Sequence, residues 1–442
     1  MKLQKLLGRL YKAMGFYVLI AALLIVGVIG APNKVPSIGG VAETLRGVNT
    51  RGNIYDRNQT AIVWNASESG PSEREYMDGE LYQPFVGYYS RQSGRISGLE
   101  RLYDETLLLS DADKTKGNSL VLTVEAGLQR AISSAMATDA KGSCVVLNAS
   151  TGEILGMLSN PSFDPKKIDS IYSSLQKSDV FVNKATAAYI PGSVMKIATA
   201  ASIVRNDLED EQYHDSGAFR IESFTVVNNA NAQFGNVALR EGLGFSVNTY
   251  FAYMSQMLGH DAYEQTLKSF LVGERIGLDF DFLSSEYNIS TPLKLAVTSY
   301  GQGETTISAM QMAMITSSVA TKGTMYKPYL VKEIIGPNGN TASETSPVAL
   351  SEPLTRAEAE IIASGMKISA ERVGLSAPNG IYSKTGTAET GVKGKENLWL
   401  TCYFDHKGTP YTITMMLVGR KGTGSDLGPA VQKVADYIMQ NY

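Results

Sequence analysis

The sequence predicts an α+β protein, and two observations support this prediction. Segments typical of strands lie towards both ends of the C-terminal part, whereas helical periodicity dominates between residues 185 and 367. Outer strands of this kind can meet in one antiparallel sheet beside a helical region. The chain begins with a basic segment and an apolar stretch, and a region with few long periodic runs follows them. We therefore expect four parts, comprising residues 1–12, 13–31, 32–117 and 118–442.

The N-terminal segment is typical of a membrane anchor. Its uncharged apolar stretch at 13–31 has about the length that spans a bilayer as a helix. By the positive-inside rule, residues 1–12 stay in the cytoplasm and the chain beyond Pro32 lies outside. A cleaved signal peptide is the alternative, although its apolar region is usually shorter. The basic residues before the stretch are Lys2, Lys5, Arg9 and Lys12.

Residues 32–117 predict a small head domain of strands and loops. This region is rich in Gly, Ser and Tyr and carries no catalytic motif. Two interpretations of its charged residues are open. They form a docking surface for a partner, or they pair internally and brace the rest of the chain. These residues include Arg51, Asp56, Arg57 and Glu100.

Local patterns predict the main elements of residues 118–442. Residues 143–148 and 154–159 have the composition of a β-hairpin. Helical periodicity predicts a helix at 356–367 and a closing amphipathic helix at 428–442. Three further strands are expected at 381–389, 398–404 and 411–418.

The composition excludes several classes of function. The chain of 442 residues has 43% hydrophobic residues, enough for a large core, and a net charge of −3, which gives no reason to expect nucleic acid. The three histidines, His214, His260 and His406, are scattered along the chain. Neither a metal site nor a Ser-His-Asp triad is therefore expected. We predict no metal and no cofactor.

The most informative motif is Ser193-Val194-Met195-Lys196. A Pro-Gly pair precedes it and an apolar run follows, so Ser193 is expected to begin a helix, where serine is favoured. Lys196, three residues on, lies on the same helical face and can reach the hydroxyl. Serine is a poor nucleophile without an adjacent base. We predict Ser193 as the nucleophile and Lys196 as its base, with a pKa lowered by burial, the helix end and a second cation.

The Ser-x-x-Lys spacing is not specific by itself. It occurs again from Ser174 to Lys177 and from Ser364 to Lys367. Ser174 lies in a polar stretch expected at the exposed end of a helix, and Ser364 falls inside the predicted helix 356–367. Only Ser193 combines a helix start with partner motifs further along the chain.

The second motif is Ser246-Val247-Asn248, after a helical stretch at 237–243. Gly242 and Gly244 are the expected turn points. A hydroxyl at Ser246 can relay a proton to a leaving group, and the amide of Asn248 can hold a substrate carbonyl.

The third motif, Lys384-Thr385-Gly386, lies in the predicted strand 381–389. Lys384 is the expected second cation, and the hydroxyls of Thr385 and Thr387 are expected to bind a substrate carboxylate. Gly386 allows an extended peptide to approach the backbone closely. A serine nucleophile and a lysine base are typical of acyl transfer. This reaction also needs an oxyanion hole of N–H donors. The backbone amides of Ser193 and Thr387 are expected to supply it.

In this order, S-x-x-K, S-x-N and K-T-G are the signature set of penicillin-binding proteins and serine β-lactamases. The chain resembles a class B penicillin-binding protein, a membrane-anchored D,D-transpeptidase of bacterial cell-wall synthesis. Two departures from the family pattern, Gln59 and Val194, carry no chemistry. The other matching segments are R-G-N-I-Y-D-R-N at 51–58, G-L-E at 98–100, T-G-E-I-L at 151–155, N-P-S-F-D-P at 160–165 and G-Q-G at 301–303.

The resemblance implies both a fold and a chemistry. The fold is the penicillin-recognising transpeptidase fold, in which helices sandwich an antiparallel sheet and Ser193 lies where the sheet meets a helical subdomain. The implied substrates are peptidoglycan stem peptides ending in D-Ala-D-Ala, and β-lactam antibiotics acylate the same serine. The head is too small for a glycosyltransferase, so a separate membrane glycan polymerase is an expected partner. The expected location is the bacterial cell membrane, single-pass, with a cytoplasmic N terminus.

Three alternatives remain. A D,D-carboxypeptidase or a β-lactamase uses the same residues with water as acceptor, but the head motif at 51–58 argues against both. A non-catalytic β-lactam sensor or scaffold is the third, and the intact Lys196, Asn248 and Lys384 argue against it.

The two cysteines, Cys144 and Cys402, lie in predicted strands. In the resembled fold, the strand at 411–418 lies between theirs, which separates them by two strand spacings of about 4.8 Å. That distance is too large for a disulfide. Both are expected to be buried free thiols.

Overall fold

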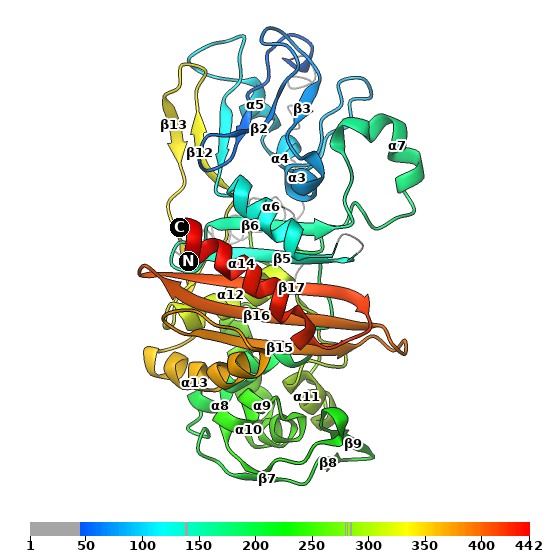
Figure 1. Cartoon of the computed structure of the whole chain (residues 1–442), viewed down its shortest axis with the longest axis vertical. Helices are drawn as coiled ribbons and strands as arrows, with labels where there is room; N and C mark the ends of the chain where they lie inside the picture. Colours follow the sequence, from blue (N-terminus) through cyan, green and yellow to red (C-terminus); the bar gives the residue numbers. More distant parts are fainter. Residues whose placement is uncertain (1–44, 138–139, 279, 281, 283–284) are drawn as a thin grey trace, which may run out of the picture. The chain divides into compact units, whose positions relative to one another are not determined.

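A five-stranded antiparallel sheet forms the centre of the unit at residues 49–442 (Figure 1). The computed structural model describes residues 45–442 except 138–139, 279, 281 and 283–284. The strand order is β15-β16-β17-β5-β6. The predicted strands are confirmed, with bounds that differ by a few residues at most. The five strands are β5 (Gly142–Asn148), β6 (Ile154–Asn160), β15 (Ile381–Glu389), β16 (Glu396–His406) and β17 (Thr409–Arg420).

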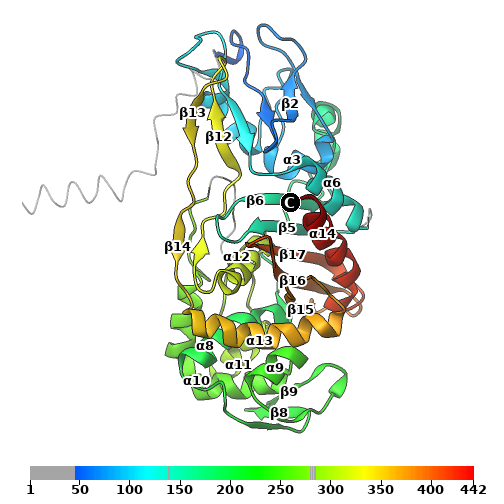
Figure 2. The same cartoon turned by 60° about the vertical axis from the view of Figure 1, so that its left-hand side comes forward.

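Helices cover both faces of this sheet, as Figure 2 shows for α12 (Ala309–Ala320) and α14 (Gly428–Asn441). On α14, the buried residues Val431, Val434, Ala435 and Ile438 recur at helical spacing, so one face packs on the sheet. It lies beside α6 (Ala126–Ala135). Nearly all of α12 is buried, because it lies between the sheet and the helical region.

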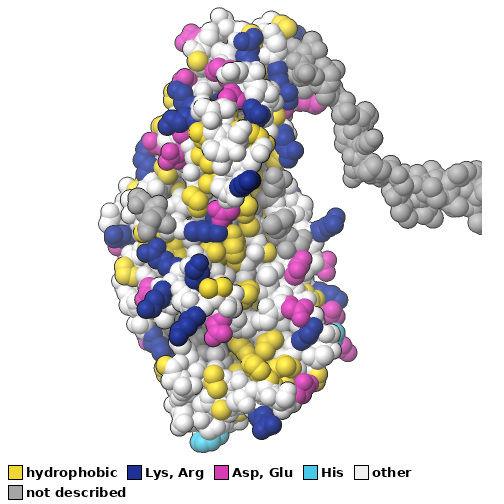
Figure 3. Space-filling model, turned by 90° about the vertical axis from the view of Figure 1, so that its right-hand side faces the viewer, with side chains coloured by type: hydrophobic (Ala, Val, Ile, Leu, Met, Phe, Trp, Pro, Cys, Tyr) yellow, Lys and Arg dark blue, Asp and Glu magenta, His cyan; other side chains and the backbone are white. Residues whose placement is uncertain are grey.

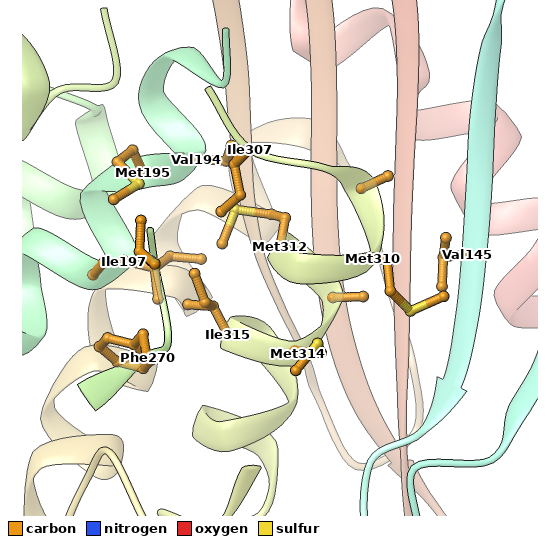
Figure 4. Close-up of a cluster of buried hydrophobic side chains, with 14 of the residues drawn as sticks. Val145, Val194, Met195, Ile197, Phe270, Ile307, Met310, Met312, Met314 and Ile315 are labelled. Atoms are coloured by element: carbon orange, nitrogen blue, oxygen red, sulfur yellow. The ribbon is translucent and has the colours of Figure 1, made fainter. Parts of the chain in front are cut away.

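The core around α12 fixes the segment that carries the first motif. Figure 4 shows Met312 and Ile315 of α12 near Val194 and Ile197, while Val145 of β5 lies on the other side of the helix. These residues belong to one continuous hydrophobic core. The nucleophile's neighbours are therefore packed through α12 onto the central sheet.

The helical region predicted between residues 185 and 367 also contains short strands. Three two-stranded sheets interrupt it: β7 (Tyr213–Asp215) with β10 (Gly235–Val237), β8 (Ala218–Ile221) with β9 (Phe224–Val227), and β11 (Met325–Tyr326) with β14 (Ala349–Ser351). Strands β12 (Val331–Ile335) and β13 (Thr341–Glu344) also lie in this part of the chain and join the sheet of the head. Segments this short show no clear alternation, so sequence periodicity does not detect them. Besides α12, the α-helices of the region are α8 (Lys196–Arg205), α9 (Leu239–Phe245), α10 (Asn248–Ser269), α11 (Pro292–Ser299) and α13 (Arg356–Val373).

Helix α13 extends six residues beyond its predicted end. A capping box between Thr355 and Glu358 begins it, and Gly374 ends it in the left-handed conformation at φ 78°. Beyond residue 118, the described residues also form the short helices η1 (Pro165–Lys167), α7 (Ile168–Leu175), η2 (Gly192–Met195), η3 (Asn229–Asn231) and η4 (Gly424–Leu427).

The head contains helices as well as the expected strands: α3 (Gly79–Val86), α4 (Gly98–Leu102) and α5 (Asp104–Leu108). Its six-stranded sheet has the order β13-β12-β4-β1-β2-β3 and crosses the expected boundary between residues 117 and 118. Pairing between strands so distant along the chain has no local signature in the sequence. The strands are β1 (Ile54–Tyr55), β2 (Ala61–Asn65), β3 (Arg74–Tyr76), β4 (Ser119–Leu122), β12 (Val331–Ile335) and β13 (Thr341–Glu344).

The charged residues singled out in the head are paired internally. Arg51 Nε donates to Glu100 Oε2 at 2.6 Å, and Arg74 Nε donates to Glu100 Oε1 at 2.9 Å. A second arm of Arg51 donates to Asp104 Oδ1 at 2.6 Å. All four side chains are buried. For Arg51 and Glu100, the structure therefore favours internal bracing over a docking surface.

Asp56 and Arg57 connect the head to the catalytic part. The Asp56 carboxylate accepts hydrogen bonds from the backbone of Asn58, Thr60 and Ala126. Arg57 forms a 3.7 Å ion pair with Glu153, next to the β5–β6 hairpin.

The prediction of two free cysteines is confirmed. Cys144 and Cys402 are both buried and unbonded to each other. Strand β17 lies between their strands, where Met415 pairs with Cys144 and Ile413 with Cys402.

The predicted basic segment and anchor at 1–12 and 13–31 lie outside the described residues. In the part of the chain that the structure describes, no helix combines the length and the hydropathy that crossing a bilayer requires.

Candidate active site

Ser193 lies in η2, one short turn before α8. The segment before it is tightly held, because Gly192 N donates to Gly301 O at 2.8 Å. Gly192 itself has φ +59°, and a Cβ there would come within 2.9 Å of Thr387 O. Only glycine fits that conformation and that contact. The turn that contains Ser193 thus packs closely against β15, the strand of the third motif.

The amine of Lys196 is the centre of the site. Its Nζ lies 3.0 Å from Ser193 Oγ and 2.6 Å from Asn248 Oδ1. It also lies 2.8 Å from the backbone oxygen of Ser246 and 3.2 Å from its hydroxyl. The predicted meeting of nucleophile and base is present in this geometry.

Burial and charge both favour an uncharged amine at Lys196. Burial is the larger cause that lowers its pKa well below the usual lysine value, and the charge of Lys384 lowers it further. A base has to accept a proton, so the lowered pKa suits Lys196 to the role predicted for it.

Ser246 occupies the turn between α9 and α10. It ends α9 in the left-handed conformation, with φ 62° and ψ 43°, and Asn248 is the first residue of α10. The prediction that Gly242 and Gly244 form the turn is wrong, because both lie inside α9. A Cβ at Gly242 would come within 2.5 Å of Tyr250, so close packing explains this glycine.

Lys384 completes the cluster from β15. Its Nζ donates to Ser246 Oγ at 2.8 Å and to Thr385 O at 3.1 Å. Burial, and after it the charge of Arg372, lowers the pKa of Lys384 to about 7. The hydroxyl of Ser246 therefore lies between two lysine amines, where it can pass a proton.

Gly386 is expected to let an extended peptide approach the backbone, but the segment close to its Cα belongs to the protein itself. A Cβ at this position would come within 2.7 Å of Pro191 O and 3.2 Å of Val194 Cγ1. The segment that approaches the strand here is the nucleophile's own turn.

The two threonines of the third motif alternate with Lys384 and Gly386 along β15, so they lie on the other side of the strand. Thr387 Oγ1 accepts a hydrogen bond from Gly424 N at 3.0 Å. This bond leaves the hydroxyl proton of Thr387 free to be donated. The carboxylate contact expected for Thr385 and Thr387 stays a prediction, as does the oxyanion hole.

The structure separates Ser193 from the other two Ser-x-x-Lys serines. Ser174 is exposed, and its hydroxyl donates to Ile171 O at 2.7 Å within α7. Ser364 donates to Ile361 O at 2.7 Å within α13. Both hydroxyls therefore bond locally, as expected for serines within helices.

Three residues of the site have no signal in the sequence motifs. Val227 O accepts from Asn248 Nδ2 at 3.0 Å and so orients this amide. Trp399 Nε1 donates to Ile190 O at 2.9 Å and ties β16 to the turn before Ser193. Arg372 contributes to the lowered pKa of Lys384. All three come from distant segments.

A large groove elsewhere is not the site of this chemistry. It has a volume of about 730 Å³, and its lining includes Phe85, Tyr88 and Phe181 but no residue of the three motifs. Hydrophobic side chains are also gathered near the middle of the face shown in Figure 3. The catalytic groups are therefore located by their hydrogen bonds and not by this groove.

Comparison with protein families agrees with this arrangement. The family described as penicillin binding protein transpeptidase domain matches residues 142–440, and the penicillin binding protein A dimerisation domain matches residues 51–127. The chain belongs to the penicillin-binding protein transpeptidases. The resemblance expected from the motifs is confirmed at this level.

Two curated relatives show how far the likeness extends. Penicillin-binding protein 3 of Bacillus subtilis is 27% identical over 85% of this chain and 61% of its own length. The peptidoglycan D,D-transpeptidase PbpA of Mycolicibacterium smegmatis is 27% identical over 72% of this chain and 73% of its own length. The chain thus spans about three fifths of the length of the first of these relatives.

Solved structures match the fold closely. The D,D-transpeptidase domain of a peptidoglycan glycosyltransferase from Eggerthella lenta has a TM-score of 0.82 at 25% identity, covering 89% of this chain and 98% of that one. Penicillin-binding protein A from M. tuberculosis, in its penicillin G acyl-enzyme complex, has a TM-score of 0.80 at 25% identity, covering 89% and 100%. The expected transpeptidase fold is confirmed.

Proposed function

We propose that this protein is a peptidoglycan D,D-transpeptidase. The observation that carries the proposal is the 3.0 Å distance between Lys196 Nζ and Ser193 Oγ, in a cluster completed by Ser246, Asn248 and Lys384. The name of the M. smegmatis relative and the penicillin acyl-enzyme of the M. tuberculosis neighbour support this assignment.

The acylation step follows from the positions of these groups. Ser193 Oγ attacks the carbonyl carbon between the two D-alanines of a stem peptide, and its proton passes to Lys196 Nζ. When the C–N bond breaks, the leaving D-alanine takes a proton through Ser246 Oγ, which both lysines contact. The backbone amides of Ser193 and Thr387 are assigned to the oxyanion.

The second step transfers the acyl group. An amine on a neighbouring peptidoglycan strand attacks the ester carbon and loses a proton to the same relay. Ser193 takes up a proton and is released. Asn248 Nδ2 holds the carbonyl of the substrate's acyl side chain in both steps. Lys384 with Thr385 and Thr387 binds the terminal carboxylate in the first step, before it leaves with D-alanine. A β-lactam acylates Ser193 by the first step alone.

The proposal includes a membrane anchor at residues 13–31 and a separate glycan polymerase. The basic residues before an apolar stretch of bilayer length support the anchor, with a cytoplasmic N terminus. The small size of the head supports a partner that polymerises the glycan.

Mass spectrometry of the purified protein tests the assignment. Penicillin should add one acyl group on a peptide containing Ser193, and Ser193→Ala should abolish this adduct. The matched variants Ser174→Ala and Ser364→Ala should keep it. A penicillin adduct that survives Ser193→Ala would overturn the assignment.

A D-Ala-D-Ala peptide with and without an added amine separates the alternatives. A transpeptidase gives an amide product with the amine. Hydrolysis alone indicates a carboxypeptidase, rapid release of hydrolysed penicillin indicates a β-lactamase, and a stable adduct without peptide turnover indicates a sensor.

A further inference from the structure

Asp215, at the end of β7, is a buried carboxylate outside the three motifs, with 1% of its surface exposed. Its Oδ1 accepts from Thr249 Oγ1 at 2.6 Å and from Gly217 N at 3.0 Å. Its Oδ2 accepts from Phe234 N at 2.8 Å and from Asn228 Nδ2 at 2.9 Å. These donors use the acceptor capacity of both oxygens.

Two of these four donors are next in sequence to Asn248 or to its hydrogen-bond partner Val227. Thr249 follows Asn248 in α10, and Asn228 follows Val227, whose oxygen accepts from Asn248 Nδ2. Asn228 Oδ1 also accepts from Thr249 N at 3.2 Å. The Asp215 carboxylate therefore joins the start of α10 to the segment after β9.

Two hydrogen bonds of the Asn248 amide define its orientation. Asn248 Oδ1 accepts from Lys196, and Nδ2 donates to Val227 O. A flipped amide would set two oxygens against each other at Val227, and it would take from Lys196 the oxygen to which its amine donates. One N–H of the half-buried Asn248 side chain remains for a substrate.

We propose that Asp215 is a positioning residue that orients the Asn248 amide toward the side-chain carbonyl of the substrate. It acts through Asn228 and Val227 on one side and through Thr249 on the other, without touching the substrate. The inference rests on the proposed function, because it requires that Asn248 holds this carbonyl.

The variant Asp215→Asn disturbs this link with little change in size. The backbone N–H groups of Gly217 and Phe234 donate to different oxygens and cannot become acceptors. Whichever oxygen becomes an NH₂ group, one of these two donors loses its partner. The segment that carries Val227 or the start of α10 should therefore shift.

The measurement is the ratio of two acylation rate constants. Benzylpenicillin carries a side-chain carbonyl for Asn248, whereas aminopenicillanic acid has a free amine in its place. Asp215→Asn should reduce the rate constant for benzylpenicillin divided by that for aminopenicillanic acid. The expected decrease is roughly 3- to 10-fold, the range of one hydrogen bond. Equal losses with both compounds would reduce Asp215 to a structural role and overturn the proposal.

A double-mutant cycle makes the test specific. Asn248→Ala should lower the same ratio, and Asp215→Asn should lower it no further in that background. A further decrease there, or an unchanged ratio in Asn248→Ala, would overturn the inference. Acylation of Ser193 in the parent protein by both compounds tests the proposed function independently.

Two more variants complete the design. Asp56→Asn removes a buried carboxylate that also accepts from backbone N–H groups, so it should lower the melting temperature and leave the ratio unchanged. If Asp215→Asn does not fold, Thr249→Ala removes one donor to Asp215 and should shift the ratio in the same direction. An unchanged ratio in folded Thr249→Ala would contradict the inference.

Discussion

Lys384 Nζ donates to Ser246 Oγ at 2.8 Å, and Lys196 Nζ approaches the same oxygen at 3.2 Å. The two lysines thus share one hydroxyl but differ in their surroundings. Lys196 also contacts the nucleophile, whereas Lys384 lies on the strand expected to bind the substrate. This difference supports the proposed roles of Lys196 as base and Lys384 as cation.

The role of Lys196 as base predicts a large effect of Lys196→Arg. Guanidinium keeps the positive charge but does not deprotonate in proteins. Acylation of Ser193 by penicillin should fall by ~10² to 10⁴, the contribution of a general base. Stopped-flow or quenched labelling measures this rate. Lys177→Arg, in a second Ser-x-x-Lys sequence, should leave it unchanged, and a loss of only a few-fold in Lys196→Arg would mean that another group takes the proton.

The lowered pKa of Lys384 predicts a pH dependence that depends on the carboxylate of the substrate. Lys384 has a pKa of about 7 and is charged below that pH. The bimolecular acylation rate constant of a penicillin should therefore decrease as the pH rises above about 7, because this constant reports the free enzyme. The methyl ester of the same penicillin should lack this decrease. A decrease of equal size for the ester would rule out a carboxylate contact at Lys384.

Stability should depend on pH through the same lysine. Its pKa is about 7 in the folded state against 10.5 for an ordinary lysine, so the unfolded chain binds more protons between these values. The free energy of unfolding should gain up to ~1.4 kcal/mol per pH unit in this window from Lys384 alone. Lys384→Met should remove this slope, so its gain in stability over the parent should be largest below pH 7.

Thermal unfolding at several pH values checks this prediction. Lys367→Met, on the exposed face of α13, is the control and should leave the slope in place. Lys196, whose pKa is also lowered, keeps its own contribution to the slope in this variant. A slope in Lys384→Met equal to that of the parent would assign the titration to another group.

The buried ion pairs of the head predict a structural role for Glu100. Burial alone would raise the pKa of Glu100, but Arg74 and Arg51 outweigh this effect and hold it below the usual value. Glu100→Gln leaves two buried arginines short of a partner and should cost about 3–5 kcal/mol of unfolding free energy. Chemical denaturation measures this loss.

The exposed ion pair between Asp111 and Lys114 provides the matched control. Asp111→Asn should change the free energy of unfolding by less than about 1 kcal/mol. If Glu100→Gln is equally mild, the buried network does not brace the head, and docking becomes the better account of these charges.

Much of the site is encoded locally, and these parts are visible in the sequence. A Pro-Gly break before Ser193 and the three-residue spacing to Lys196 place the hydroxyl and the amine on one turn. The strand at 381–389 and the hairpin strands predicted at 143–148 and 154–159 follow from composition. Helix starts, strand periodicity and motif spacing depend on neighbours along the chain, so they need no tertiary information.

Only the tertiary structure decides the relationships between distant segments. The bond from Lys384 to Ser246 joins residues 138 positions apart, and the parallel pairing of β1 with β4 carries the head sheet across the expected domain boundary. The turn at Ser246, the lowered pKa values of both lysines and the link from Asp215 to Asn248 all arise from such contacts. Burial and long-range hydrogen bonds create them, and neither has a period or a composition that the sequence alone displays.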